Sequence, residues 1–306
     1  MARKHYYKRI QNFAVLFSIM VFAALSYGCD SNGGSATNNY RTGTRGIEIN
    51  YAASSPPSEV YYSAGSSAEI PVALEIWNRG AESGSGTIFF DGYDPNIFSA
   101  FPPSVALPLI EGKEASRNPQ GTNSFIDVKT ISVNLPEGID VWEIPLRATA
   151  CYKYSTMATI NVCVDPNPSK SGTRACTPVT NPSVSGGQGG PVAVSAIEYN
   201  AGLKKAIFTI TIKNVGGGGL VSESKTSTCL SLTQSDIDVV GVSGTLSNSA
   251  MSCMVKDGKV RLVNGEAIVV CTATLPDQSA YTTPLTIKLT YGYKYSTQKN
   301  IQIKRI

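Results

Sequence analysis

Seven cysteines are the residues of this sequence whose chemistry is easiest to predict. Cysteines in this number either bind metal or form disulfides in an oxidising compartment, and no Cys-x-x-Cys spacing favours zinc or thioredoxin-like redox exchange. Cys29 directly follows an apolar segment, which leaves six cysteines for three bridges. We expect Cys151 and Cys163 to be partners, facing each other across a hairpin whose turn lies at residues 155–159. The competing interpretation pairs Cys163 with Cys176.

The other cysteines are further disulfide candidates without a preferred pairing. Cys271 follows the turn sequence Asn264-Gly265, which favours a central strand for this residue. Three pairings remain open for the four cysteines that the first bridge leaves over, namely Cys176, Cys229, Cys253 and Cys271.

The only histidine of the chain is His5, within the first nine residues. Without a second histidine there is neither a Ser-His-Asp triad nor a Cys-His pair, and zinc sites built on imidazole are excluded. A pair of carboxylates would be the remaining catalytic arrangement, but no two acids lie inside an apolar strand. We therefore expect no enzyme and no cofactor.

The segment Asp91-Gly-Tyr-Asp94-Pro-Asn could offer oxygen ligands to calcium. Asp-Pro-Asn is also a common turn sequence, and we favour the turn over a metal site at Asp91 and Asp94.

Aromatic residues divide into two groups. Four tyrosines alternate with polar residues in a pattern that favours a buried strand face: Tyr152, Tyr154, Tyr293 and Tyr295. Tyr61, Tyr62 and Trp77 are the better candidates for exposed contacts with a partner or a glycan.

Residues 1–28 have the pattern of a secretory signal peptide. Four cations and no acid stand in the first nine residues, and an apolar run from Phe13 to Leu25 is followed by small residues. The remaining Lys and Arg then balance the 22 Asp and Glu, so the basic net charge of the chain does not indicate nucleic-acid binding.

The segment Leu25-Ser-Tyr-Gly28-Cys29 resembles the lipobox of prokaryotic lipoproteins. This resemblance implies lipidation of Cys29 and attachment to a membrane through the N-terminal lipid. Two alternatives are a secreted protein cleaved after Gly28 and an uncleaved anchor helix, since residues 10–28 carry no charge. All three predict export, with the rest of the chain outside the cell. We expect the protein at the outer face of the cell membrane or in the cell envelope.

An internal repeat predicts two domains. Tyr-Lys-Tyr-Ser-Thr occurs at residues 152–156 and again at 293–297, and Leu-Pro-acid and Asn-x-Gly sequences precede it in the same order in both copies. We predict a flexible tether at residues 29–46, a first domain at 47–164, a Pro/Gly-rich linker at 165–191 and a second domain at 192–306.

Alternation of apolar and polar residues predicts an all-β fold. Residues 70–76, 128–135, 205–213 and 284–294 all show the period of half-buried strands. The strand-ending sequences Asn78-Arg-Gly80 and Asn214-Val-Gly216 resemble those of Ig-like modules in archaeal and bacterial surface proteins, including the CARDB-like family. This resemblance implies two tandem Ig-like β-sandwich domains behind the signal or anchor helix.

Together these patterns favour a membrane-anchored structural or adhesive protein of a prokaryotic cell surface. Its partner would be another envelope protein or a glycan. The alternative is an accessory lipoprotein that binds a carbohydrate or another ligand.

Overall fold

The structure is a computed structural model that describes residues 40–63, 68–170, 172–185 and 187–306. These residues are almost entirely β-strands, and the only helices among them are the short 3₁₀ segments η1 (Glu223–Thr228) and η2 (Gln234–Asp236). The predicted all-β class is therefore confirmed. None of the helical turns in these ranges has the length or the apolar character needed to cross a bilayer. The signal peptide predicted at residues 1–28 and the lipidation predicted at Cys29 lie outside the described residues.

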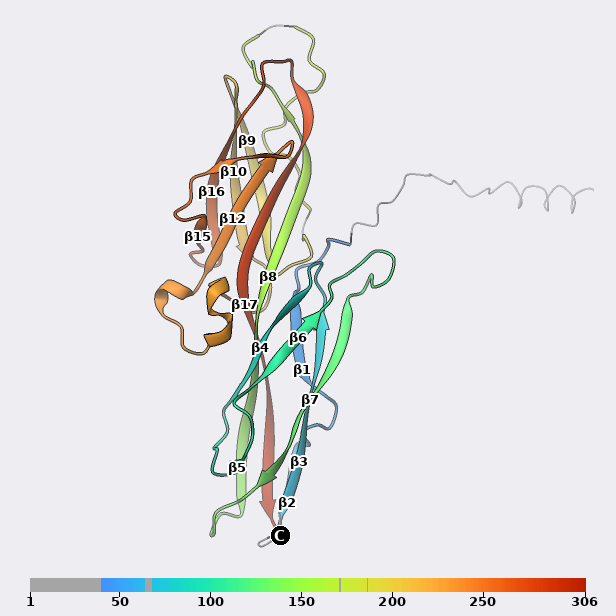
Figure 1. Cartoon of the computed structure of the whole chain (residues 1–306), viewed down its shortest axis with the longest axis vertical. Helices are drawn as coiled ribbons and strands as arrows, with labels where there is room; N and C mark the ends of the chain where they lie inside the picture. Colours follow the sequence, from blue (N-terminus) through green and yellow to red (C-terminus); the bar gives the residue numbers. More distant parts are fainter. Residues whose placement is uncertain (1–39, 64–67, 171, 186) are drawn as a thin grey trace, which may run out of the picture. The chain divides into compact units, whose positions relative to one another are not determined.

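Two four-stranded sheets belong to different parts of the sequence (Figure 1). The first has the order β1 (Ile47–Tyr51), β3 (Ala68–Asn78), β7 (Thr122–Val133) and β5 (Phe98–Ser99). The second has the order β14 (Ser252–Cys253), β16 (Glu266–Thr274), β10 (Lys205–Asn214) and β9 (Val192–Gly202).

A nine-stranded sheet faces both of them. Its main path runs through β13 (Ser249–Ala250), β12 (Val239–Leu246), β17 (Tyr281–Arg305), β8 (Val141–Val164), β4 (Gly84–Asp91) and β6 (Ser104–Ile110). Three further strands pair at its sides: β2 (Glu59–Tyr62) and β11 (Gly219–Val221) with β17, and β15 (Lys259–Arg261) with β12.

Strands β8 and β17 form the centre of this large sheet. They pair antiparallel without a register shift, from Val141 opposite Lys304 to Val164 opposite Tyr281. The prediction of a turn at residues 155–159 is therefore wrong, because these residues are part of β8. Their sequence Ser-Thr-Met-Ala-Thr contains neither Gly nor Asn to support a tight turn, whereas threonine suits an extended strand.

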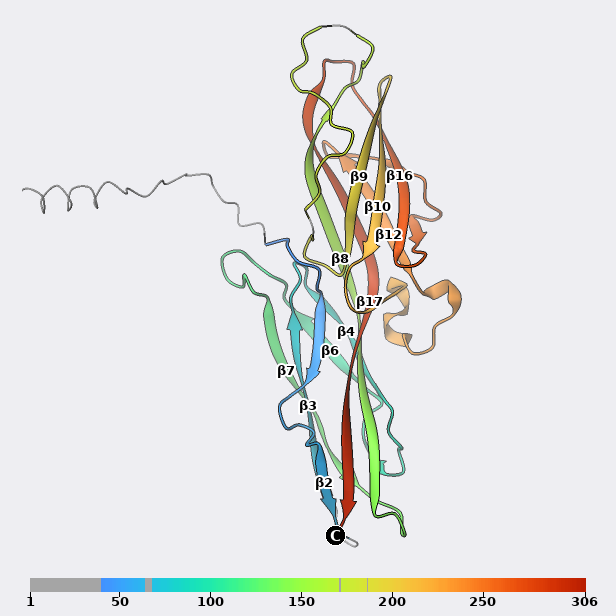
Figure 2. The same ribbon diagram turned by 180° about the vertical axis from the view of Figure 1, so that it is seen from behind.

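Each of these long strands is shared between two sandwich-like halves, as Figure 2 shows from behind. The first sandwich combines β1, β3, β5 and β7 with β4, β6, residues 141–152 of β8 and residues 293–305 of β17. The second sandwich combines β9, β10, β14 and β16 with β12, residues 281–292 of β17 and residues 153–164 of β8. Strand β8 thus passes from the first sandwich into the second, and β17 passes from the second into the first.

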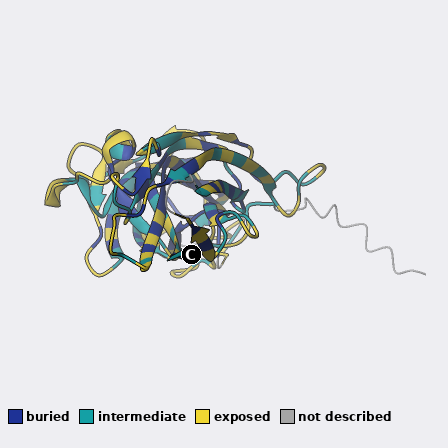
Figure 3. Ribbon diagram, turned by 90° about the horizontal axis from the view of Figure 1, so that it is seen from below, coloured by how far each residue is buried: buried dark blue, intermediate teal, exposed yellow. Residues whose placement is uncertain are grey.

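Burial follows the alternation in the sequence. Strand β3 buries Ile70, Val72, Leu74 and Ile76 completely, while the residues between them stay at least partly exposed. Figure 3 shows the resulting alternation of buried and exposed positions along the strands. The apolar faces of all three sheets join in one hydrophobic core, as expected for stacked sheets.

Part of the segment predicted as a tether is packed against the first sandwich. Gly43 accepts a hydrogen bond from the backbone N–H of Gly189, and Arg41 forms an ion pair with Glu82. The backbone of Gly46 accepts from the N–H of Arg79. Residues 40–46 are therefore a fixed part of the fold, which corrects the prediction for this part of residues 29–46.

The predicted linker is also ordered at both of its ends. Gln188 is buried and its side chain bonds both the N–H and the C=O of Val194. A Cβ on Gly187 would lie 2.6 Å from the backbone oxygen of Gly43, so glycine here permits a close contact between two backbones. Gly187, Gly189 and Gly190 of the predicted Pro/Gly-rich linker therefore allow tight packing.

The turn predicted at Asn264-Gly265 is present, with φ of 53° and 77°. The strands on its two sides separate, however, because β15 pairs with β12 in the large sheet and β16 pairs with β10. The turn thus connects the two layers of the second sandwich.

Candidate functional site

Three disulfides bridge the six cysteines of the described chain: Cys151–Cys229, Cys163–Cys176 and Cys253–Cys271. The predicted Cys151–Cys163 bridge is wrong, and the competing pairing of Cys163 with Cys176 is the one present. Cys151 and Cys163 lie on the same extended strand, where twelve residues span about 40 Å, far beyond the reach of a disulfide.

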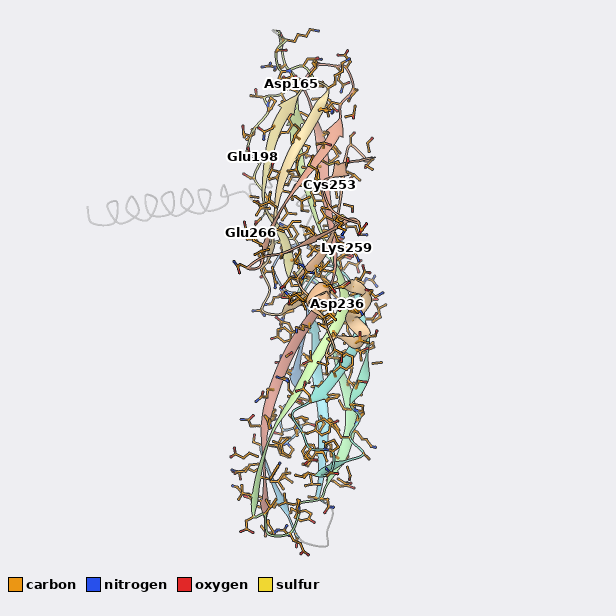
Figure 4. All side chains as sticks on the ribbon, turned by 90° about the vertical axis from the view of Figure 1, so that its left-hand side faces the viewer. Asp165, Glu198, Asp236, Cys253, Lys259 and Glu266 are labelled. Atoms are coloured by element: carbon orange, nitrogen blue, oxygen red, sulfur yellow. A yellow bond between two sulfur atoms is a disulfide. The ribbon has the colours of Figure 1, made fainter. Side chains whose placement is uncertain are left out.

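Each bridge has a different role in the fold. Cys151–Cys229 joins the crossing region of β8 to the end of η1, while Cys253–Cys271 links opposed residues of β14 and β16. Cys271 lies in an interior strand of its sheet, as predicted. Cys253 is labelled in Figure 4.

The third bridge, Cys163–Cys176, closes a short loop after β8 that holds the buried carboxylate of Asp165. Arg174 pairs with this carboxylate at 2.9 Å, and the Asp165 backbone N–H donates to Tyr199 Oη at 3.0 Å. Figure 4 shows Asp165 at one end of the second sandwich.

Four tyrosines meet where the paired strands β8 and β17 pass from one sandwich into the other. Tyr152 lies opposite Tyr293 and Tyr154 opposite Tyr291, and the four rings pack on one another at centroid distances of 5.7–6.3 Å. All four are buried, as predicted for Tyr152, Tyr154 and Tyr293. The predicted fourth member, Tyr295, is only partly buried, and Tyr291 takes its place.

Two of the four tyrosine hydroxyls bond the two Asn-x-Gly turns. Tyr154 Oη donates to Asn78 Oδ1 at 3.0 Å, and Tyr293 Oη donates to Asn214 Oδ1 at the same distance. Each asparagine also accepts from the N–H of the glycine two residues later, and its amide donates to a carbonyl two residues beyond that glycine. Asn78 is completely buried, so the motif fixes the end of its strand.

The tyrosine cluster therefore has a structural role. Burial raises the pKa of Tyr152 and Tyr291 well above the usual value for a phenol, and burial likewise raises the pKa of Tyr154 and Tyr293. All four hydroxyls stay protonated at neutral pH and serve as hydrogen-bonding groups between strands.

The predicted contact aromatics lie in three different environments. The side chain of Tyr61 is 57% exposed, and its hydroxyl donates to Glu59. Tyr62 is buried beneath the guanidinium of Arg305, so its predicted role as an exposed contact residue is wrong. In β2 the two residues point to opposite faces, as strand geometry requires.

Trp77 lies on the outward face of the first four-stranded sheet and is partly exposed. The guanidinium of Arg79 stacks over its ring at 4.4 Å, and its indole N–H donates to Glu75 Oε1 at 2.7 Å. Trp77 pairs with Asn123 of β7, which places Phe125 diagonally beside it on the same face. Phe125 is 63% exposed and was not identified from the sequence, because a single phenylalanine in an alternating strand gives no signal of facing outwards.

We call this surface the Trp77 face. It combines two aromatic rings with amide and carboxylate side chains on neighbouring positions of three strands. Its members are Glu48, Asn50, Glu75, Trp77, Asn123 and Phe125.

A cavity of about 510 Å³ adjoins the Trp77 face where the two sandwiches meet. Arg45, Glu48, Asn50 and Arg79 form its wall on the side of the first sandwich. The opposite wall comes from Pro191 and the loop after β10, and Tyr152, Tyr293 and Tyr295 also line the cavity.

The two aspartates proposed for calcium are engaged in other contacts. Asp91 pairs with Arg147 at 2.6 Å, while Asp94 Oδ1 accepts hydrogen bonds from the backbone and the side chain of Asn96. The latter bonds are those of a side-chain-stabilised turn. Among the residues that the structure describes, no three His, Cys, Asp or Glu side chains form a cluster able to hold a metal ion.

The fold and the three bridges define an all-β, disulfide-bonded protein of the kind found in oxidising, extracellular environments. The chain matches no model of a known protein family, and a comparison with curated proteins finds no similar sequence.

Proposed function

We propose that this chain is an exported structural or interaction protein of a prokaryotic cell surface, tethered through its N-terminus and built from two Ig-like modules. The observation that carries the proposal is the uninterrupted pairing of β8 with β17 through both sandwiches. Because each module contains part of the other's last strand, the modules cannot rotate freely as two domains on a linker would. Such a unit suits a rigid spacer that presents its faces and loops at a distance from a membrane.

Two further features support the same proposal. The three disulfides fit an oxidising compartment, and they fasten the strand crossing, the loop after β8 and the β14–β16 edge. The N-terminal sequence, with its cations, apolar run and Cys29, has the pattern of an export signal followed by a lipid attachment site.

Intact mass of the protein purified from bacterial membranes tests this function. We expect a chain that begins at Cys29, carries a lipid increment and lacks six hydrogens relative to the reduced form. The control is Cys29→Ser, which should lose the lipid but retain the three disulfides. A full-length, reduced protein in the cytosol would contradict the proposal.

The Trp77 face favours a second function, the binding of a saccharide. Aromatic rings stack on the apolar faces of sugars, while adjacent amides and carboxylates bond their hydroxyls, and this surface offers both within three strands. We expect binding on a glycan array to be lost in Trp77→Ala and weakened in Phe125→Ala. Tyr61→Ala is the matched control, since Tyr61 is an exposed aromatic residue of strand β2, in another sheet.

A further inference from the structure

The cavity beside the Trp77 face contains more positive than negative charge. Arg45 and Arg79 both approach the same carboxylate oxygen, Oε2 of Glu48, at 3.5 and 3.3 Å. One carboxylate is therefore shared between two guanidinium groups. A third cation, Lys113, lies nearby and donates to the backbone oxygen of Thr42.

Arg79 is the better fixed of the two guanidinium groups. Its ring contact with Trp77 and its backbone N–H bond to Gly46 hold it at the cavity wall. Within the described chain its Nε is buried without a hydrogen bond, because the approach to Glu48 lacks the required geometry. A buried donor in this state is one that an additional acceptor would stabilise.

The two arginines also act on Lys113, which lies near the cavity without lining it. Burial lowers the pKa of Lys113, and the nearby charges of Arg79 and Arg45 lower it further. A bound anion would relieve this repulsion, so the field at the cavity favours negative charge.

The wall opposite the arginines leaves room for a ligand. Gly216 and Gly217 line it without side chains, and a Cβ on Gly217 would meet no atom within 4 Å. The cavity volume of about 510 Å³ falls in the range of small-molecule sites.

We propose that this cavity binds the carboxylate of an acidic saccharide, with the neighbouring sugar units lying along the Trp77 face. The inference rests on the proposed saccharide binding and specifies its ligand class. The planar guanidinium groups match a carboxylate, and Asn50 and Tyr295 line the same cavity with groups that bond sugar hydroxyls. The ligand carboxylate would bind Arg45 and Arg79, which now share the carboxylate of Glu48.

Titration calorimetry on the disulfide-bonded chain from residue 30 onward tests the proposal with three probes: oligogalacturonate, a neutral galactose oligomer of equal length, and polyglutamate. We expect oligogalacturonate to bind at least about tenfold more tightly than either of the others, with affinity falling as salt rises. Arg79→Gln and Arg45→Gln should each weaken oligogalacturonate binding about tenfold.

Two substitutions separate charge from shape. Gly217→Asp adds a carboxylate to the open wall and should abolish binding of the acidic oligomer, while the isosteric control Gly217→Asn should retain it. Glu48→Gln removes the internal competitor and should strengthen binding several-fold.

The outcomes distinguish this proposal from the function on which it rests. Equal binding of the acidic and neutral oligomers, both lost in Trp77→Ala, would overturn the carboxylate site but leave saccharide binding intact. Equal binding of polyglutamate, unaffected by Trp77→Ala, would show a general anion site and overturn the saccharide assignment. Binding of none of the three probes would overturn both.

Discussion

The hydroxyl of Tyr154 donates a 3.0 Å hydrogen bond to Asn78 Oδ1 and accepts one of 3.2 Å from the backbone N–H of Glu82. Tyr293 repeats both bonds with Asn214 and the N–H of Gly218. Each of these two buried tyrosines therefore joins a long strand of the large sheet to the turn that ends a strand of a four-stranded sheet.

Replacing Tyr154 by phenylalanine should destabilise the protein by about 1–3 kcal/mol, because buried polar groups at Asn78 and Glu82 lose a partner. Tyr293→Phe should have a smaller effect of the same sign, since its acceptor Asn214 is only partly buried, whereas Asn78 is completely buried. Urea unfolding followed by fluorescence measures both. Tyr61→Phe is the control and should change stability by less than about 0.5 kcal/mol, as its hydroxyl is exposed. If Tyr154→Phe were as stable as the control, the hydrogen bonds would have no net stabilising role.

The same tyrosines predict the alkaline limit of stability. Burial raises the pKa of Tyr152, Tyr154, Tyr291 and Tyr293 in the folded state, whereas in the unfolded chain they ionise near pH 10. Their contribution is therefore fully present below about pH 10 and is lost as the pH rises above it, by up to about 1.4 kcal/mol per pH unit for each tyrosine. Unfolding free energies measured between pH 8 and 12 should show this decline.

The matching observation is the ultraviolet absorbance of tyrosinate. We expect the contribution of the four buried tyrosines to appear only together with unfolding, because burial raises their pKa. Ionisation of these four near pH 10, with the fold intact, would contradict the assigned burial.

The alternating strands could be predicted from the sequence because strand burial depends on local period. Residues 70–76 and 205–213 lie in β3 and β10 as expected. The exchange of strand halves could not be predicted. The five-residue repeat aligns Tyr152 with Tyr293, but the hydrogen bonds make Tyr154 the counterpart of Tyr293, so the sequence repeat is two residues out of register with the structural one.

The errors in the site have a similar physical origin. The Cys151–Cys163 pairing depended on a turn within β8. Neither the length nor the partner of this strand is fixed by its local sequence, because no glycine or proline lies between Cys151 and Cys163. The Pro/Gly-rich composition of residues 165–191 predicted a linker, yet a glycine also permits the close backbone contact that Gly187 makes with Gly43. The cavity between Arg45 and Gly217 joins residues far apart in sequence, and only the strand crossing brings them together.

The disulfides should differ in their contribution to stability. Cys151–Cys229 closes a segment of 78 residues, and Cys253–Cys271 one of 18. By loop-closure entropy these lengths correspond to about 4.5 and 3 kcal/mol. We expect the double variant Cys151→Ala/Cys229→Ala to have a lower unfolding free energy than Cys253→Ala/Cys271→Ala, as measured in guanidinium chloride. The reverse order would indicate that the crossing remains closed without its bridge.

The shared strands predict that neither sandwich folds alone. A fragment of residues 40–178 would leave residues 153–164 of β8 without β17, and its sandwich would lack residues 293–305. We therefore expect each of the fragments 40–178 and 179–306 to be unfolded or aggregated when expressed separately, as judged by circular dichroism and size-exclusion chromatography. When co-expressed in an oxidising compartment, the two should assemble into one particle that retains the Cys151–Cys229 bridge. The control is the intact chain cleaved at an inserted protease site after Pro178, which tests the effect of the break itself. Two separately folded, monomeric fragments would show that the pairing of β8 with β17 is dispensable, and the rigid-spacer function proposed for the chain would lose its basis.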